Sequence, residues 1–266
     1  MATNERMSSI KQTATMKGDT HMTTTDQTTA TKRVPMDSLR KTALVAGVLY
    51  LLTFVSIPTL FLYGPVKSAN YILGAGPDTS AIIGGILEII VALAGIGTAV
   101  VLFPVLKKQN EAAALGLVAS RILESGTIFV GVAFLLSIVT LRQAGVGAAG
   151  LVTGHALVVL YDRIFLLGPS FMPAICDLLL GILLYQSRLV PRGLSLIGIV
   201  GAPILLAGYF AVMFGLIGTS QASITAIPVA LFEFSLGVWL IAKGFNPSAI
   251  ASLYAKTETN ELVSAE

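Results

Sequence analysis

The chain has 266 residues, of which 55% are hydrophobic and 12% charged, and its mean hydropathy is +0.84. Soluble domains carry about a quarter charged residues, so these charges are too few to cover a water-facing surface, and a soluble globular enzyme is excluded. One cysteine excludes a disulfide framework and a Cys-based metal site, and with two histidines a multi-histidine metal centre is not expected. A net charge of +3 is too small for nucleic-acid binding. We therefore expect a membrane protein whose partner is the lipid bilayer, with no metal, cofactor or nucleic acid.

Residues 1–39 form a polar, Thr-rich stretch without an apolar run. Such a stretch buries too little surface to offset its ordering entropy, so we expect a disordered N-terminal tail that is not a signal peptide. A second hypothesis is that translation starts at Met36. The membrane domain is then predicted over residues 40–245, followed by a polar C-terminal tail over residues 246–266.

Six apolar segments of the membrane domain are long enough to cross a bilayer as helices, for which about 20 apolar residues suffice. They cover residues 42–63, 81–106, 112–141, 156–186, 193–217 and 222–242. The fourth is longer than one crossing needs, and Pro169 and Pro173 predict a kink in it. We expect one long kinked span there; a broken span with an interfacial first turn is the alternative. The predicted fold is all-α, with six transmembrane helices in one bundle.

Basic residues are concentrated on one side of this topology. That side carries Lys32, Arg33, Arg40, Lys41, Lys107, Lys108, Arg188, Arg192 and Lys243, whereas the other carries only Lys67 and Arg142. By the positive-inside rule, both termini are expected in the cytoplasm and the protein in the plasma membrane. The run 186–192 is typical of a cytoplasmic loop, and contact with anionic lipid is a second interpretation of it.

Seven ionisable side chains fall inside the predicted spans: Glu88, Arg121, Glu124, Asp162, Arg163, Asp177 and Glu233. A charge at mid-helix costs roughly 2.5–3.5 kcal/mol on insertion scales, so these side chains should face the bundle interior. Glu88, Glu124 and Glu233 lie on stripes of small residues that favour close helix packing. We therefore predict a cluster of these three acids around Arg121, with Asp162 and Arg163 adjoining it, and expect Asp177 to reach water or to pair with Arg188.

Five acids and two bases leave an excess of three negative charges among these seven residues, so at least one carboxyl is expected to be protonated or in contact with water. Two interpretations follow. The cluster is a transporter-like site for a proton, cation or small polar solute, or its charges are structural in a scaffold or accessory subunit that binds partner membrane helices. An enzyme is less expected, and no catalytic residue is assigned, because the sequence has no familiar nucleophile, nucleotide or zinc motif.

Five sequence blocks occur in an order that resembles a known bacterial family. They are VLFPVLKKQNEAAALG (101–116), ASRILESG (119–126), YDRIFLLGPSF (161–171), LLYQSRLVPRGLS (183–195) and PVALFEFSLGVWLIAKGF (228–245). Together they resemble the domain-of-unknown-function family 4386, small integral-membrane proteins of bacteria, over about residues 40–246. The resemblance implies a six-helix plasma-membrane protein with no established activity. The residues that match the family's charged blocks are Arg121, Glu124, Asp162, Arg163, Arg188 and Glu233.

Overall fold

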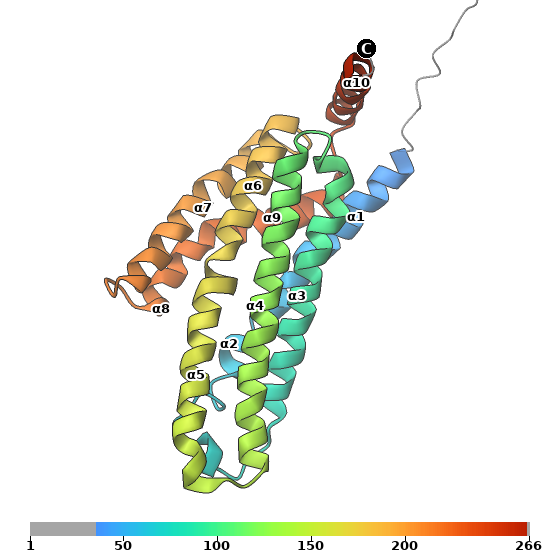
Figure 1. Cartoon of the computed structure of the whole chain (residues 1–266). Coiled ribbons are helices and arrows are strands. Elements are labelled where there is room, and N and C mark those ends of the chain that lie inside the picture. Colours follow the sequence, from blue (N-terminus) through green and yellow to red (C-terminus); the bar gives the residue numbers. More distant parts are fainter. Residues whose placement is uncertain (1–35, 265–266) are drawn as a thin grey trace, which may run out of the picture. The chain divides into compact units, whose positions relative to one another are not determined.

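The computed structural model describes residues 36–264, and every regular element in that range is a helix (Figure 1). Six helical stretches are long and apolar enough to cross a membrane, which confirms the predicted number of spans. They are Asp37–Ser56, Thr79–Leu106, Glu111–Gln143, Gly147–Ser187, Arg192–Met213 and Thr219–Ala242. Residues 1–35, which make up most of the predicted tail (1–39) and precede the alternative start, lie outside this range. Residues 36–39 of that tail belong to the first helix, which begins at Met36 and not at the boundary predicted at residue 40.

The first span ends earlier than the apolar pattern predicted. Helix α1 (Met36–Leu52) passes into a 3-10 turn, η1 (Thr53–Ser56), and a one-turn helix α2 (Thr59–Leu62) follows Pro58. The hydroxyl groups of Thr53, Ser56 and Thr59 each donate to the carbonyl three residues before them, at 2.7, 3.1 and 2.6 Å. These bonds compete with regular helix, and Pro58 has no N–H to continue it. The chain therefore turns where uninterrupted helix was expected.

The next two spans, α3 (Thr79–Leu106) and α4 (Glu111–Gln143), form a helical hairpin and pack side by side (Figure 1). Before α3, the chain makes a second 3-10 turn, η2 (Tyr71–Leu73). The side chain of Asn110 caps α4 by accepting a hydrogen bond from the N–H of Ala113 at 3.0 Å. This pair of helices supplies Glu88, Arg121 and Glu124, which are all buried.

The fourth span is one helical stretch of 41 residues that begins earlier than the predicted residues 156–186, and a single kinked crossing by it stays a prediction. It consists of η3 (Gly147–Gly150), α5 (Leu151–Phe165), a π-helical turn η4 (Leu166–Ser170) and α6 (Met172–Ser187). Pro169 lies inside the π turn, and π turns and prolines are the usual causes of a kink. At 1.5 Å per residue the stretch is about 60 Å long, roughly twice the thickness of a bilayer's hydrocarbon core.

The last two spans are α7 (Arg192–Met213) and a stretch made of α8 (Thr219–Ala222), η5 (Ser223–Ala226) and α9 (Ile227–Ala242); α10 (Pro247–Ser264) follows. Helix α9 packs against both α1 and α7. It meets α1 closely, because a Cβ atom on Gly47 would lie only 2.7 Å from the carbonyl oxygen of Gly237. This contact brings Glu233 of α9 toward the other polar residues of the bundle.

Large apolar side chains cover the outward faces of the spans. Leu115 and Leu123 on α4, Val200 on α7 and Phe234 on α9 are each about half exposed. Such surfaces are stable against lipid chains and unfavourable against water. The fold is thus that of a membrane-embedded helical bundle.

Candidate functional site

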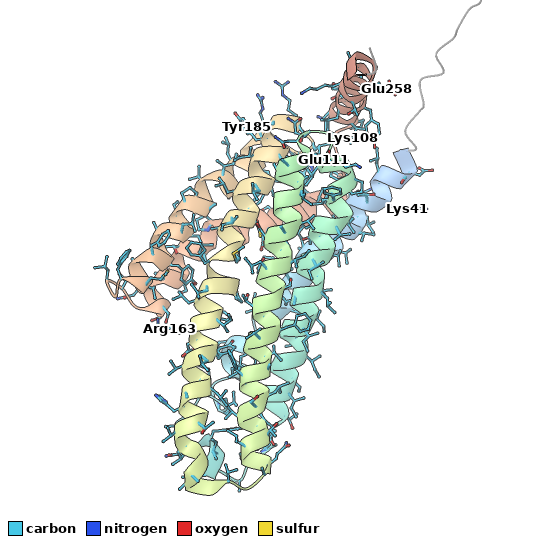
Figure 2. The ribbon with its side chains drawn as sticks, viewed as in Figure 1. Lys41, Lys108, Glu111, Arg163, Tyr185 and Glu258 are labelled. Atoms are coloured by element: carbon cyan, nitrogen blue, oxygen red, sulfur yellow. The ribbon has the colours of Figure 1, made fainter. Side chains whose placement is uncertain are left out.

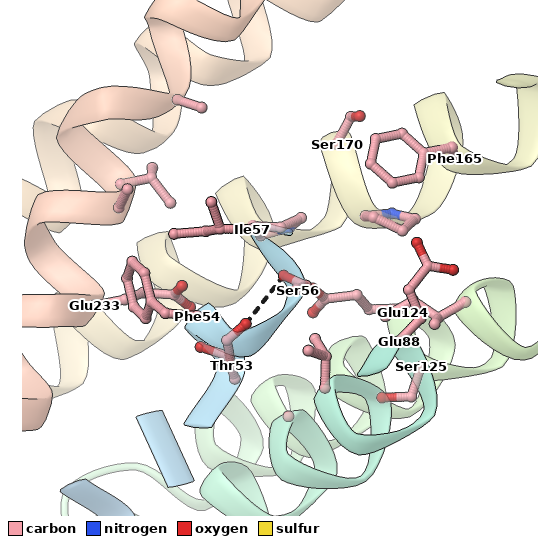
Figure 3. Close-up of a pocket in the computed structure, with 18 of the residues that line it drawn as sticks. Thr53, Phe54, Ser56, Ile57, Glu88, Glu124, Ser125, Phe165, Ser170 and Glu233 are labelled. Atoms are coloured by element: carbon pink, nitrogen blue, oxygen red, sulfur yellow. Dashed lines mark hydrogen bonds between the residues drawn. The ribbon is translucent and has the colours of Figure 1, made fainter. Parts of the chain in front are cut away.

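A cavity of about 350 Å³ lies among the spans, between η1, α3, α4, the π turn, α7 and α9. Its charged lining residues are Glu88, Arg121, Glu124 and Glu233, so the structure brings four of the six predicted site residues to one space. Figure 3 shows the three carboxylates arriving from different helices, with Ser125 and Ser170 among the labelled hydroxyl side chains. Phe54 and Phe165 add apolar wall.

Arg121 is the centre of the polar cluster and is only 3% exposed. Its Nη1 donates to Glu124 Oε2 at 3.0 Å, and its Nη2 forms an ion pair with Glu233. The same Nη2 lies 3.6 Å from Oδ1 of Asp177. The guanidinium thus faces acids from α4, α6 and α9, and its pairing with Glu124 is the i, i+3 contact that the sequence predicted.

Asp177 lies elsewhere than the sequence analysis predicted. It was expected to reach water or to pair with Arg188, but it is completely buried beside Arg121. Ala174, Asp177, Leu180 and Leu184 are buried at helical spacing on α6, so this acid lies on the packed face of its helix. That spacing was the signal in the sequence that could have placed it.

Glu88 lines the same cavity but does not bind Arg121. Its two carboxylate oxygens accept hydrogen bonds from the phenols of Tyr63 and Tyr161, at 3.0 and 3.2 Å. Gly84 makes this arrangement possible, because a Cβ atom there would lie 2.5 Å from the ring of Tyr63. The sequence analysis did not identify either tyrosine as a partner, since nothing in the local pattern brings residues 63, 88 and 161 together.

The structure does not bring Asp162 and Arg163 to the cluster. Asp162 forms an ion pair with Lys67 at 2.5 Å, with its side chain 52% exposed, and Arg163 is an exposed residue of α5 (Figure 2). The preceding residue, Tyr161, points inward and is buried. Each further residue rotates the helix by about 100°, so the next two side chains point away from the bundle.

The polar interior has more negative groups than positive ones. It contains one base, Arg121, and four acids: Glu88, Glu124, Asp177 and Glu233. The formal excess of three negative charges is the same as in the sequence analysis, although Asp162 and Arg163 are no longer part of the set. Four of the five buried polar atoms without a hydrogen bond in the described part of the chain lie in this region: Tyr50 Oη, Arg121 Nε and both oxygens of Asp177. An arrangement of this kind favours added positive charge, either as protons or as a cation.

A family model matches residues 45–244, which is most of the membrane domain. Comparison with curated proteins and with solved structures finds no significant match. The matched range covers all four charged residues of the cavity and Asp177. The chain therefore belongs to the family described as "Domain of unknown function (DUF4386)".

Proposed function

We propose that this chain is a transporter-like membrane protein whose central cavity binds a proton or a small cationic, partly apolar solute. The observation that carries the proposal is that three carboxylates and one guanidinium line the same cavity of about 350 Å³. Ligand pockets span about 300–1,000 Å³, so this one suits a small molecule. An ammonium group would find acidic partners, and Phe54 and Phe165 offer apolar contact to its substituents.

The contacts suggest how binding would proceed. Arg121 holds Glu124 and Glu233, and an entering cation would compete with the guanidinium for the same carboxylates. Glu88, which has two phenol donors and no basic partner among the described ion pairs, is the group best suited to take up and release a proton. Coupling between these steps would arise because each added positive charge relieves the same negative excess.

The test is thermal melting of the purified full chain with increasing concentrations of methyl-, propyl- and butylammonium chloride. A ligand that binds only the folded state raises the melting temperature with its concentration. Glu233→Gln should abolish the rise, whereas Asp162→Asn, which removes a carboxylate outside the cavity, should keep it. The proposal of a cationic solute fails if sodium chloride at equal ionic strength gives the same rise.

The alternative is a scaffold or accessory subunit whose interior charges are structural and whose surface binds partner membrane helices. Arg121 favours it, because this one side chain joins α4, α6 and α9. Melting of Glu124→Gln and Glu233→Gln across pH separates the two functions. A variant that melts below the parent, with a difference that fades at acid pH, supports the structural role, whereas one that melts above it supports a site that trades stability for function.

We further propose that the protein lies in a bacterial plasma membrane with both termini in the cytoplasm. An even number of spans would leave both ends on one side, and that side would have most of the loop lysines and arginines. Cysteine labelling tests this, since the single native Cys176 is buried. In right-side-out membranes, an impermeant maleimide should label Asn70→Cys but not Gln109→Cys, and the reverse result would invert the topology.

A further inference from the structure

A second cavity, of about 450 Å³, lies at the ends of three spans and has no part in the proposed transport site. Helix α6 ends at Ser187, α7 begins at Arg192 and α9 ends at Ala242. The two segments that leave these ends, 188–191 and 243–247, line the cavity. It therefore lies where the membrane-spanning part of the chain meets the water phase.

The backbone fixes the two segments that line this cavity. Arg188 is the single non-glycine residue with a positive φ, 57°, in the described range, and it ends α6 in the left-handed conformation. Leu189 next to it is completely buried, and its carbonyl accepts a hydrogen bond from the N–H of Asn246 at 2.9 Å. This hydrogen bond joins the two segments, so the backbone positions from which their side chains extend are fixed relative to each other.

The charge of the lining is entirely positive. Arg188, Arg192 and Lys243 line the cavity, and no acidic residue does. The ion pairs described for residues 36–264 include none of the three. The guanidinium of Arg192 is further positioned 4.8 Å from the ring centre of Tyr185, which Figure 2 labels near that end of α6. Three cations around one space repel each other unless an anion lies between them.

The rest of the lining is apolar or amphipathic. Leu189, Val190 and Phe245 are buried apolar residues of the wall, and Trp239 contributes a partly buried indole. Tryptophan is enriched at this depth of a membrane because its ring suits both lipid and water. Guanidinium groups bind phosphate through paired N–H donors. The cavity thus combines phosphate-binding groups with a surface for hydrocarbon.

We propose that this cavity is a binding site for a phosphate-bearing anion, held by Arg188, Arg192 and Lys243 and covered on one side by Trp239. Two sources share that chemistry, the headgroup of an anionic phospholipid and a soluble phosphate or phosphate ester. The apolar wall favours the lipid.

Trp239 is the chain's one tryptophan, so tryptophan fluorescence, excited where tyrosine does not absorb, reports on this cavity. The full chain is reconstituted in dioleoylphosphatidylcholine bilayers that contain increasing fractions of dibrominated phosphatidylglycerol or dibrominated phosphatidylcholine, whose bromines quench indole on contact. We expect the anionic lipid to quench at a lower mole fraction than the zwitterionic one. Each base removed should weaken that preference about fivefold, so R188Q/R192Q/K243Q should abolish it.

The matched control is K41Q/K107Q/K256Q, which removes the same charge from exposed lysines outside the cavity. It should keep the preference, and R188K/R192K, which keeps the charge, should retain it in part. A second arm titrates inorganic phosphate and glycerol 3-phosphate in uncharged detergent against sodium chloride. A saturable change in tryptophan fluorescence in detergent that depends on the three bases identifies a soluble phosphate as the ligand. A change in fluorescence that occurs only in bilayers identifies the lipid. Equal quenching by both lipids with no phosphate response, or equal losses in the two triple variants, would overturn the proposal.

Discussion

Arg121 of α4 and Asp177 of α6 lie 3.6 Å apart in the buried interior, and neither oxygen of Asp177 has a hydrogen-bond partner. The guanidinium directs its hydrogen bonds to Glu124 and Glu233. One base therefore serves three acids, and the third is held by charge and packing alone. This asymmetry determines how the cluster responds to substitution.

Arg121→Gln should destabilise the bundle more than neutralising any one of its acidic neighbours. Loss of the base leaves Glu124, Asp177 and Glu233 together without a counter-charge, and breaking a buried ion pair from one side costs about 3–5 kcal/mol. Thermal melting in detergent measures the effect. Arg163→Gln, which removes an exposed base from α5, is the control and should change little. A loss for Arg121→Gln no larger than for Glu124→Gln would contradict the cluster as the structure has it.

Asp177→Asn should melt at or above the temperature of the parent protein. The substitution loses no hydrogen bond and removes one negative charge from an interior with too many. Asp177→Ala serves as the comparison, because it removes the same charge but leaves a void in a completely buried position and should melt lower. The double variant Arg121→Gln/Asp177→Asn should recover part of the loss of Arg121→Gln. If the two residues interact, this recovery exceeds any rise in melting temperature that Asp177→Asn gives in the parent protein, whereas changes that simply add would show that they do not interact.

The number of spans and four of the six residues expected in the cluster could be predicted from the sequence, for identifiable reasons. Hydropathy over about 20 residues located the spans, and the i, i+3 spacing of Arg121 and Glu124 put both side chains on one face of α4, within reach of each other. Tertiary packing sets the rotation of a helix about its axis. The position of a residue along its span does not indicate that rotation. Asp162 and Arg163 consequently turned outward, and Asp177, about 15 Å from the end of α6, turned inward.

The partners of Glu88 were beyond prediction for a different reason. Tyr63 lies at the start of the irregular segment between α2 and α3, whereas the sequence analysis had placed it at the end of a continuous first span. The hydroxyl-rich turn η1 and Pro58 redirect the chain, and this brings the phenol back over α3. A local competition between side-chain and backbone hydrogen bonds thus decided a long-range contact.

Asp78 should make stability depend on pH through a clamp between the start of α3 and the end of α4, which consists of Asp78, Tyr71, Arg142 and Gln143. Its carboxylate pairs with Arg142 and accepts hydrogen bonds from Tyr71 and Gln143, the latter at 2.8 Å. Burial alone would raise the pKa of Asp78, but these hydrogen bonds and the charge of Arg142 outweigh it and lower the pKa. A lowered pKa adds stability above the unfolded value of about 3.9 and loses it as the pH falls through the folded value.

Asp78→Asn should therefore melt below the parent at pH 7, by a difference that shrinks toward pH 3. Arg142→Gln should reproduce the pattern, because the ion pair needs both partners. A difference that is the same at every pH would assign the clamp to hydrogen bonding without charge. Burial and the hydrogen bond to Asp78 also raise the pKa of Tyr71 to about 12. In a titration followed by ultraviolet absorbance, Tyr71 should therefore ionise at a higher pH than exposed tyrosines do.

Gly84→Ala should weaken the contact between Tyr63 and Glu88. The added methyl would lie 2.5 Å from the Tyr63 ring, so the ring has to move away from the 3.0 Å hydrogen bond that it donates to Glu88. Overpacking of this kind costs about 1–3 kcal/mol. Gly126→Ala is the matched control on α4, because nothing lies within 4 Å of its new methyl, and the gain in helix propensity should stabilise it by up to about 1 kcal/mol. Gly84→Ala should therefore lower the melting temperature and Gly126→Ala should raise it. If both variants raise the melting temperature, the Tyr63 ring has moved to make room for the methyl. Tyr63→Phe would then show whether Glu88 needs this hydrogen-bond donor.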